Sequence, residues 1–180
     1  MSTAGPLEAW WQEVSAVAWE LRGRRVSVLA AQDRLADLLG RVPLPALAAR
    51  LDLDRVAAPA ILPDRGVLEA DLDLTAVAGL PPRAGFGAQV VAGRAGRAVP
   101  PHGHGNSCTG FVVLRGRWHG RLFDRVETHP DHYVLRPTAD RAFGPGDVST
   151  ASDARDNVHW FRATTDGAAL LNVHVTGDDP

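Results

Sequence analysis

The chain has 180 residues, of which 45% are hydrophobic, and this suits one globular domain with a sizeable core. Its net charge of -2 and its scattered arginines provide no basic field for a nucleic-acid backbone, and no apolar run reaches the roughly 18 residues of a membrane span. Cys108 has no second cysteine to pair with, which favours a reducing compartment. We therefore expect a cytoplasmic monomer or homodimer that binds neither nucleic acid nor membranes.

The first predicted element is an amphipathic helix over residues 7–22. Ser2 or Thr3 suits its N-cap, Pro6 suits its first turn, and Gly23 can end it. Its apolar residues recur at spacings of three and four, which is the helical period. They are Leu7, Trp10, Trp11, Val14, Val17, Ala18 and Leu21.

Two further helices are expected over 28–39, ending at Gly40, and over 44–51. Residues 1–55 are thus interpreted as a helical segment that packs on a sheet. We interpret the tryptophan stripe of the first helix as core or a dimer face, because large apolar residues at helical spacing are usually buried.

The rest of the chain, 56–180, is predicted to be mainly β. Prolines and glycines interrupt residues 57–82, where one edge strand is expected near 68–77. Short β-rich runs then follow at near-even spacing, and this is typical of a sandwich or barrel. The expected strands are 85–92, 96–101, 109–116, 118–126, 132–137, 147–151, 157–164 and 168–175.

Three histidines are candidate metal ligands. His102 and His104 are one residue apart in an extended segment, so their side chains share one face. An apolar run closed by Gly116 follows them and is predicted to be a buried strand. His159 lies in a later β-rich run, after a Gly-Pro-Gly-Asp turn. Two histidines in a loop rich in proline and glycine could equally be solvated, but this ordered set favours metal binding.

These residues resemble the two motifs of the cupin superfamily. His102, His104 and Gly116 match the first motif, and Gly146 and His159 match the second more loosely. Thr109 stands where the first motif has a glutamate. The resemblance implies a small cupin β-barrel of the jelly-roll type, preceded by the helical segment.

A cupin without the glutamate has three imidazole ligands, and in this the chain is similar to the thiol dioxygenases. His174 follows His159 by fifteen residues and matches the histidine of the catalytic relay in cysteine dioxygenases, while Asn172 and Thr176 replace its serine and tyrosine. The resemblance implies His102, His104 and His159 as ligands of Fe(II), with His174 and Asn172 in catalysis. Without it, His174 would be interpreted as a core histidine that bonds the backbone.

The chemistry of three imidazole ligands also favours a metal site that binds a thiol. Three neutral imidazoles leave a divalent ion its full charge and open positions, which attract thiolates. Iron(II) is expected because such a site can take a thiol and O2 together, although zinc also accepts three histidines. The expected reaction is oxidation of a small thiol to its sulfinate. The alternatives are a cupin that binds metal or a ligand without oxygen chemistry and, more weakly, a hydrolytic or isomerising enzyme.

Arg83 and Thr109 are the predicted substrate-binding residues. Arg83 precedes the first core strand, about where cysteine dioxygenases carry the arginine that binds a carboxylate, so a substrate of the cysteine or 3-mercaptopropionate type is ranked first. Arg94, Arg97 and Arg162 remain alternatives. Cys108 should face away from Thr109 as a small buried hydrophobe.

Overall fold

The computed structural model describes residues 5–58, 60–105 and 107–177. Ser2 and Thr3, the expected helix caps, lie outside this part of the chain, and the first helix begins after Gly5 with Pro6 in its first turn. The helices lie at the expected places, with one additional short turn. They are α1 (Pro6–Arg22), α2 (Val28–Gly40), α3 (Leu44–Leu51) and α4 (Leu53–Val56).

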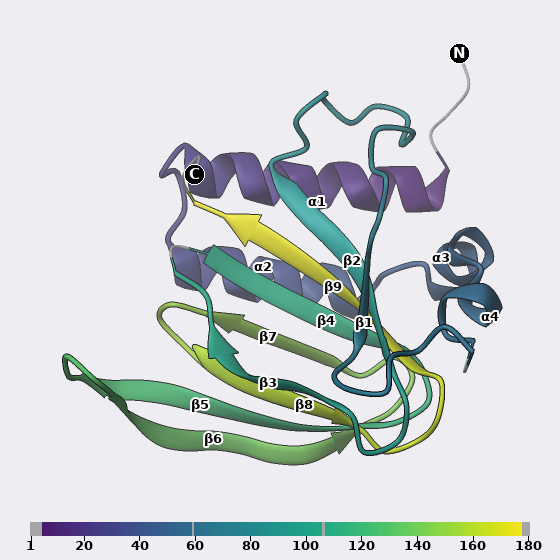
Figure 1. The fold of residues 1–180 in the computed structure, drawn as a ribbon. Coiled ribbons are helices and arrows are strands. Elements are labelled where there is room, and N and C mark those ends of the chain that lie inside the picture. The colour runs from purple at the N-terminus through teal and green to yellow at the C-terminus, as the bar shows by residue number, and fades with distance from the viewer. Residues whose placement is uncertain (1–4, 59, 106, 178–180) are drawn as a thin grey trace.

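The strands form two antiparallel sheets that face each other (Figure 1). The larger sheet contains, in spatial order, β1 (Leu68–Asp71), β2 (Phe86–Gly93), β9 (Ala168–Thr176), β4 (Ser107–Arg115) and β7 (Val148–Ser152). The smaller sheet contains β3 (Ala98–Gly103), β8 (Val158–Ala163), β5 (Trp118–Thr128) and β6 (Tyr133–Phe143).

The pairing of the strands defines a jelly roll. β5 and β6 form a hairpin, and each strand before it pairs with its counterpart after it: β4 with β7, β3 with β8 and β2 with β9. A long hairpin has thus folded over, and contacts of β4 with β9 and of β5 with β8 complete the sheets. This arrangement is the double-sheet jelly roll that the cupin resemblance implies. The prediction of a mainly β fold with N-terminal helices is confirmed.

Two separate cores follow from the alternation of side chains along each strand. On β9, the residues Ala169, Leu171, Val173 and Val175 face outward, where α1 and α2 cover the larger sheet (Figure 1). The alternate residues Ala168 and Leu170 face the opposite sheet. The helical segment therefore covers apolar surface that one sheet alone would expose to water.

The interior between the sheets is filled with apolar side chains at one end only. This cluster consists of Val91, Phe111, Val113, Trp118, Leu122, Phe143, Phe161, Ala163, Ala168 and Leu170. Toward the other end, the inward-facing residues of the same strands become polar, as Asn172 and His174 of β9 show. The fold thus provides a closed base and a polar cavity above it.

Some element bounds differ from the prediction. The edge strand expected near 68–77 spans only Leu68–Asp71. β6 continues to Phe143, although it was expected to end at Pro137, because this proline lies at a register shift in an edge strand, where proline is tolerated. Among the described residues, no helix is long and apolar enough to cross a membrane.

The contact of α2 with β4 depends on a residue without a side chain. A Cβ at Gly110 would overlap Leu39 and press against Leu35, both on α2. We expect Gly110→Ala to lower the free energy of unfolding by about 1–3 kcal/mol through overpacking. Gly87→Ala is the matched control, because a Cβ there meets nothing within 4 Å and should change stability by less than about 0.5 kcal/mol. Urea denaturation of both variants checks this, and equal effects would contradict the packing account.

Candidate metal centre

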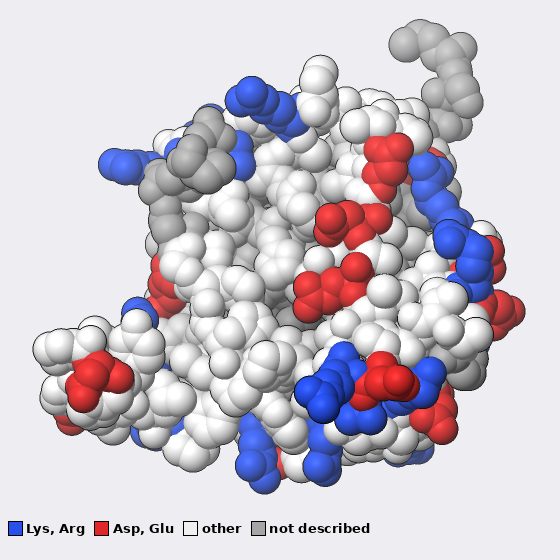
Figure 2. Space-filling model, viewed as in Figure 1, with Lys and Arg blue, Asp and Glu red and all other residues white. Residues whose placement is uncertain are grey.

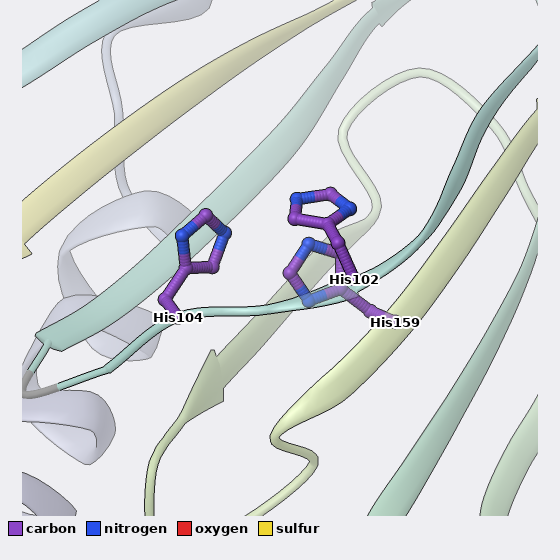
Figure 3. Close-up of side chains that lie close together, drawn as sticks. All are labelled: His102, His104 and His159. Carbon is purple, nitrogen blue, oxygen red and sulfur yellow. The ribbon is translucent and has the colours of Figure 1, made fainter. Parts of the chain in front are cut away.

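The fold brings three histidines together at the open end of the barrel. His102 lies on β3, His104 directly follows that strand, and His159 lies on β8 (Figure 3). One ring nitrogen from each lies within 4.8 Å of the other two. Around an ion with bonds of about 2.1 Å, the nitrogens would be about 3.0–3.4 Å apart, so small ring rotations would complete a site.

The backbone of β3 aims these side chains. His102 pairs directly with His159, and a β-bulge before it, at Pro100 and Pro101, inserts one residue into the ladder. Both prolines are tolerated because β3 is an edge strand. The Nδ1 atom of His102 donates a hydrogen bond to the carbonyl oxygen of Pro100 at 2.9 Å, which leaves its Nε2 lone pair available for an ion.

Burial keeps two histidines of the cluster, His104 and His159, uncharged. His159 is only 2% exposed, and burial, followed by the nearby His102 and His104, lowers its pKa to about 2. Burial also lowers the pKa of His104 to about 4, with smaller contributions from His174 and His102. Both imidazoles are therefore neutral at pH 7, which is the state that binds a metal.

Two buried nitrogens of the cluster lack a protein partner. Within the described part of the chain, Nε2 of His104 and Nδ1 of His159 have no hydrogen-bond partner. A buried polar atom without a partner costs about 1–3 kcal/mol, and a bound ion would satisfy both atoms. No carboxylate or thiol of the described residues joins this group. The donor set therefore fits a transition metal held by three imidazoles, such as iron or zinc.

His174 lies beside the three histidines and is not part of their group. Its ring centroid is 5.0 Å from that of His104. The side-chain amide of Asn172 donates to Nε2 of His174 at 2.8 Å, and Gln89 approaches the same atom at 3.4 Å. Since Nε2 accepts, Nδ1 carries the proton of the neutral ring. Burial, then His102, lowers the pKa of His174, while Asp71 acts in the opposite direction.

Thr109 holds Asn172 in place and does not line the cavity. Its side chain is fully buried, and its hydroxyl donates to Oδ1 of Asn172 at 2.8 Å, with Val173 O also in reach at 3.1 Å. Thr109, which occupies the position of the glutamate in the first cupin motif, thus orients His174 through Asn172. The structure shows Thr109 in contact with Asn172, and its expected contact with substrate stays a prediction.

Arg83 is not brought into the site either. It lies in an exposed loop before β2, and the next residue, Ala84, accepts a hydrogen bond from Ser15 of α1. The chain reaches β2 from the helical side, so this arginine is not among the residues that line the cavity, and neither are the alternatives Arg94, Arg97 and Arg162. Cys108 faces the helices as expected, and burial raises its thiol pKa to about 12.

The histidines open into a cavity of about 230 Å³. Its lining includes Gln89 and Glu69, which were not anticipated from the sequence. The alternation of β2 contains the signal for Gln89, a single polar residue on an otherwise apolar inner face. The full lining is Glu69, Gln89, Val91, Val99, His102, His104, Phe111, His159, Phe161, Leu170, Asn172 and His174.

Comparison with known proteins gives structural neighbours only. No protein-family model matches the chain, and no curated protein does. Solved structures that match include KdgF from Halomonas sp., at 17% identity over 61% of this chain and 77% of that one, with a TM-score of 0.43. An RmlC-like cupin protein from Desulfovibrio desulfuricans matches at 19% identity over 63% and 86%, with a TM-score of 0.41. Oxalate oxidase in complex with glycolate matches at 16% identity over 66% and 55%, with a TM-score of 0.47. The jelly-roll assignment rests on the strand pairing described above.

Proposed function

We propose that the chain is a cytoplasmic non-haem iron enzyme, a thiol dioxygenase that oxidises a small thiol to its sulfinate. The overall reaction is R–SH + O2 → R–SO2⁻ + H⁺, in which sulfur gives up four electrons to O2 and both oxygen atoms end on sulfur. The observation that supports it is the set of three imidazoles with no carboxylate among them, placed beside a fourth, separately held histidine.

In this function the metal and the surrounding side chains would have different roles. Fe(II) held by His102, His104 and His159 would supply open coordination positions and a charge that keeps a thiol deprotonated. Phe111 and Phe161 line the same cavity, and their rings would limit the access of water to the ligands.

His174 serves as a hydrogen-bond donor in this proposal. Asn172 occupies its Nε2 atom, so the ring presents Nδ1–H, and Thr109 fixes the amide that enforces this tautomer. A donor held in this way needs no rearrangement when negative charge develops on oxygen next to the sulfur. It supplies the polar contact that the missing tyrosine of the relay would have made.

Substitution of His174 tests whether this residue is a hydrogen-bond donor beside the metal or a ligand of the metal. We expect His174→Ala to keep its iron and to slow turnover by about 10- to 100-fold, the usual effect of removing an outer partner of a metal site. Metal analysis together with thiol-dependent O2 uptake measures both quantities. Loss of iron from His174→Ala would instead make His174 a ligand.

One observation favours a second candidate function, a cupin that binds a metal or small ligand without oxygenase activity. Thr176 stands at the tyrosine position of the relay, and its hydroxyl accepts a hydrogen bond from Arg22 at 3.0 Å. Protein purified without a metal-binding tag distinguishes the two. Bound iron with O2 uptake and sulfinate formation from cysteine, 3-mercaptopropionate or cysteamine supports the dioxygenase, and bound metal without uptake for any thiol supports the alternative.

A further inference from the structure

The edge strand β1 carries two acidic residues, Glu69, which lines the cavity, and Asp71, which lies outside its lining. Leu68 and Ala70 of this strand pack against the core under the helices. Because side chains alternate along a strand, Glu69 and Asp71 project to the other side, and Glu69 lines the histidine cavity. Figure 2 shows acidic side chains at the centre of this face, over β1, and basic side chains nearer its rim.

The charge at the mouth is negative. Among the described residues that line the cavity, Glu69 carries the only permanent charge at pH 7, since the others are apolar, amide or imidazole side chains. Asp71 pairs across the ladder with Gln89, whose amide contacts His174, and its charge acts on that ring. The arginines expected to bind a carboxylate do not line the cavity. A substrate carboxylate at the mouth would therefore lie beside a like charge, and no arginine among the described lining residues would pair with it.

We propose that Glu69 and Asp71 form a recognition site for a cationic group, so that the ligand of this cavity is a small thiol that carries a positive charge. This inference rests on the proposed function for the fate of the sulfur. The buried, unpartnered Nδ1 of His159 in the same cavity marks where the metal and thiolate end would lie. The cationic end of the ligand would face the carboxylates at the mouth of the cavity, where it would remain in contact with water.

Charged side chains on an edge strand can also serve only to prevent pairing with another chain. If Glu69 and Asp71 only prevent such pairing, replacing them with neutral residues would promote self-association and would leave the preference among ligands unchanged. Size-exclusion chromatography of the variants, run beside the binding assay, separates the two roles.

The test measures binding without turnover. Cobalt(II)-loaded protein is titrated with three thiols, and the thiolate-to-cobalt absorption gives each Kd. Cysteamine is the cationic probe, 2-mercaptoethanol is its neutral counterpart of similar size, and 3-mercaptopropionate is the anionic probe. We expect the tightest binding for cysteamine and the weakest for 3-mercaptopropionate, with the difference shrinking as salt screens the carboxylates.

The variant is the double exchange Glu69→Gln and Asp71→Asn, which keeps side-chain size. It should weaken cysteamine binding by about fivefold, as expected for two partly solvated charge pairs, and should change 2-mercaptoethanol binding by less than about twofold. The control is Glu127→Gln with Asp131→Asn, which alters the net charge equally but lies at the end of the β5–β6 hairpin. An unchanged preference among the three thiols in the Glu69 and Asp71 variant would overturn the inference.

The outcomes for the two proposals are separable. Charge-selective binding without thiol-dependent O2 uptake by the iron-loaded protein would overturn the dioxygenase and retain the cation site. Thiol oxidation with equal Kd values for the three probes would retain the dioxygenase and overturn the cation site. A protein that takes up no divalent metal would overturn both.

Discussion

Replacing His159 with leucine should abolish metal binding and at the same time stabilise the metal-free protein. The ring is 2% exposed, and its Nδ1 atom lacks a hydrogen-bond partner among the described residues. Leucine has a comparable volume and would pack beside Phe111, whose ring centroid is 5.3 Å from that of His159. Removing an unsatisfied buried polar atom without leaving a cavity should raise the free energy of unfolding by about 1–2 kcal/mol. Metal content should fall from about one ion per chain to almost none.

Elemental analysis and urea denaturation in the presence of a chelator measure these two effects. His119→Leu is the matched control, because His119 lies on the adjacent strand β5 and bonds Asp140, outside the cluster. It should keep the metal. If His159→Leu retained the metal and lost stability, His159 would be a structural core residue and the ligand assignment would be wrong.

The metal-free protein should also lose stability steeply as the pH falls below about 6.5. The folded-state pKa values of His159 and His104 are about 2 and about 4, below the value of about 6.5 expected in the unfolded chain. At a pH between the folded and the unfolded pKa values, these histidines are protonated in the unfolded chain and neutral in the folded protein. Full stability is therefore present above pH 6.5, and each such histidine removes up to about 1.4 kcal/mol per pH unit below it.

The comparison of wild type with His159→Leu isolates this effect, since the carboxylates titrate alike in both proteins. The stability advantage of the leucine variant should grow by up to about 1.4 kcal/mol for each pH unit between 6.5 and 4. Urea midpoints measured in chelator at several pH values test it. A constant difference across this range would mean that His159 titrates in the folded protein as it does in water.

The features that depend on a local sequence pattern, such as the face of a strand on which a side chain lies, were predicted from the sequence. The two-residue period placed His102 and His104 on one face and Asn172 and His174 on another, and the structure brings these faces to one cavity. The path of the loop before Arg83 was not predictable, because it is set by the packing of α1 on a sheet whose strands are distant in sequence. Glu69 was missed for the same reason, since nothing local shows which end of the barrel an edge strand will border.

The edge position of β3 has a consequence for how the site can vary. This strand has β8 as its one neighbour in the sheet, yet it carries or adjoins two of the three histidines, and its register depends on the bulge at Pro100 and Pro101. A shift of one residue would turn every side chain of a strand to its opposite face, so His102 would leave the cavity and the path of the chain to His104 would change with it. Substitutions or insertions at the bulge are therefore expected to break up the whole three-histidine cluster without changing any histidine.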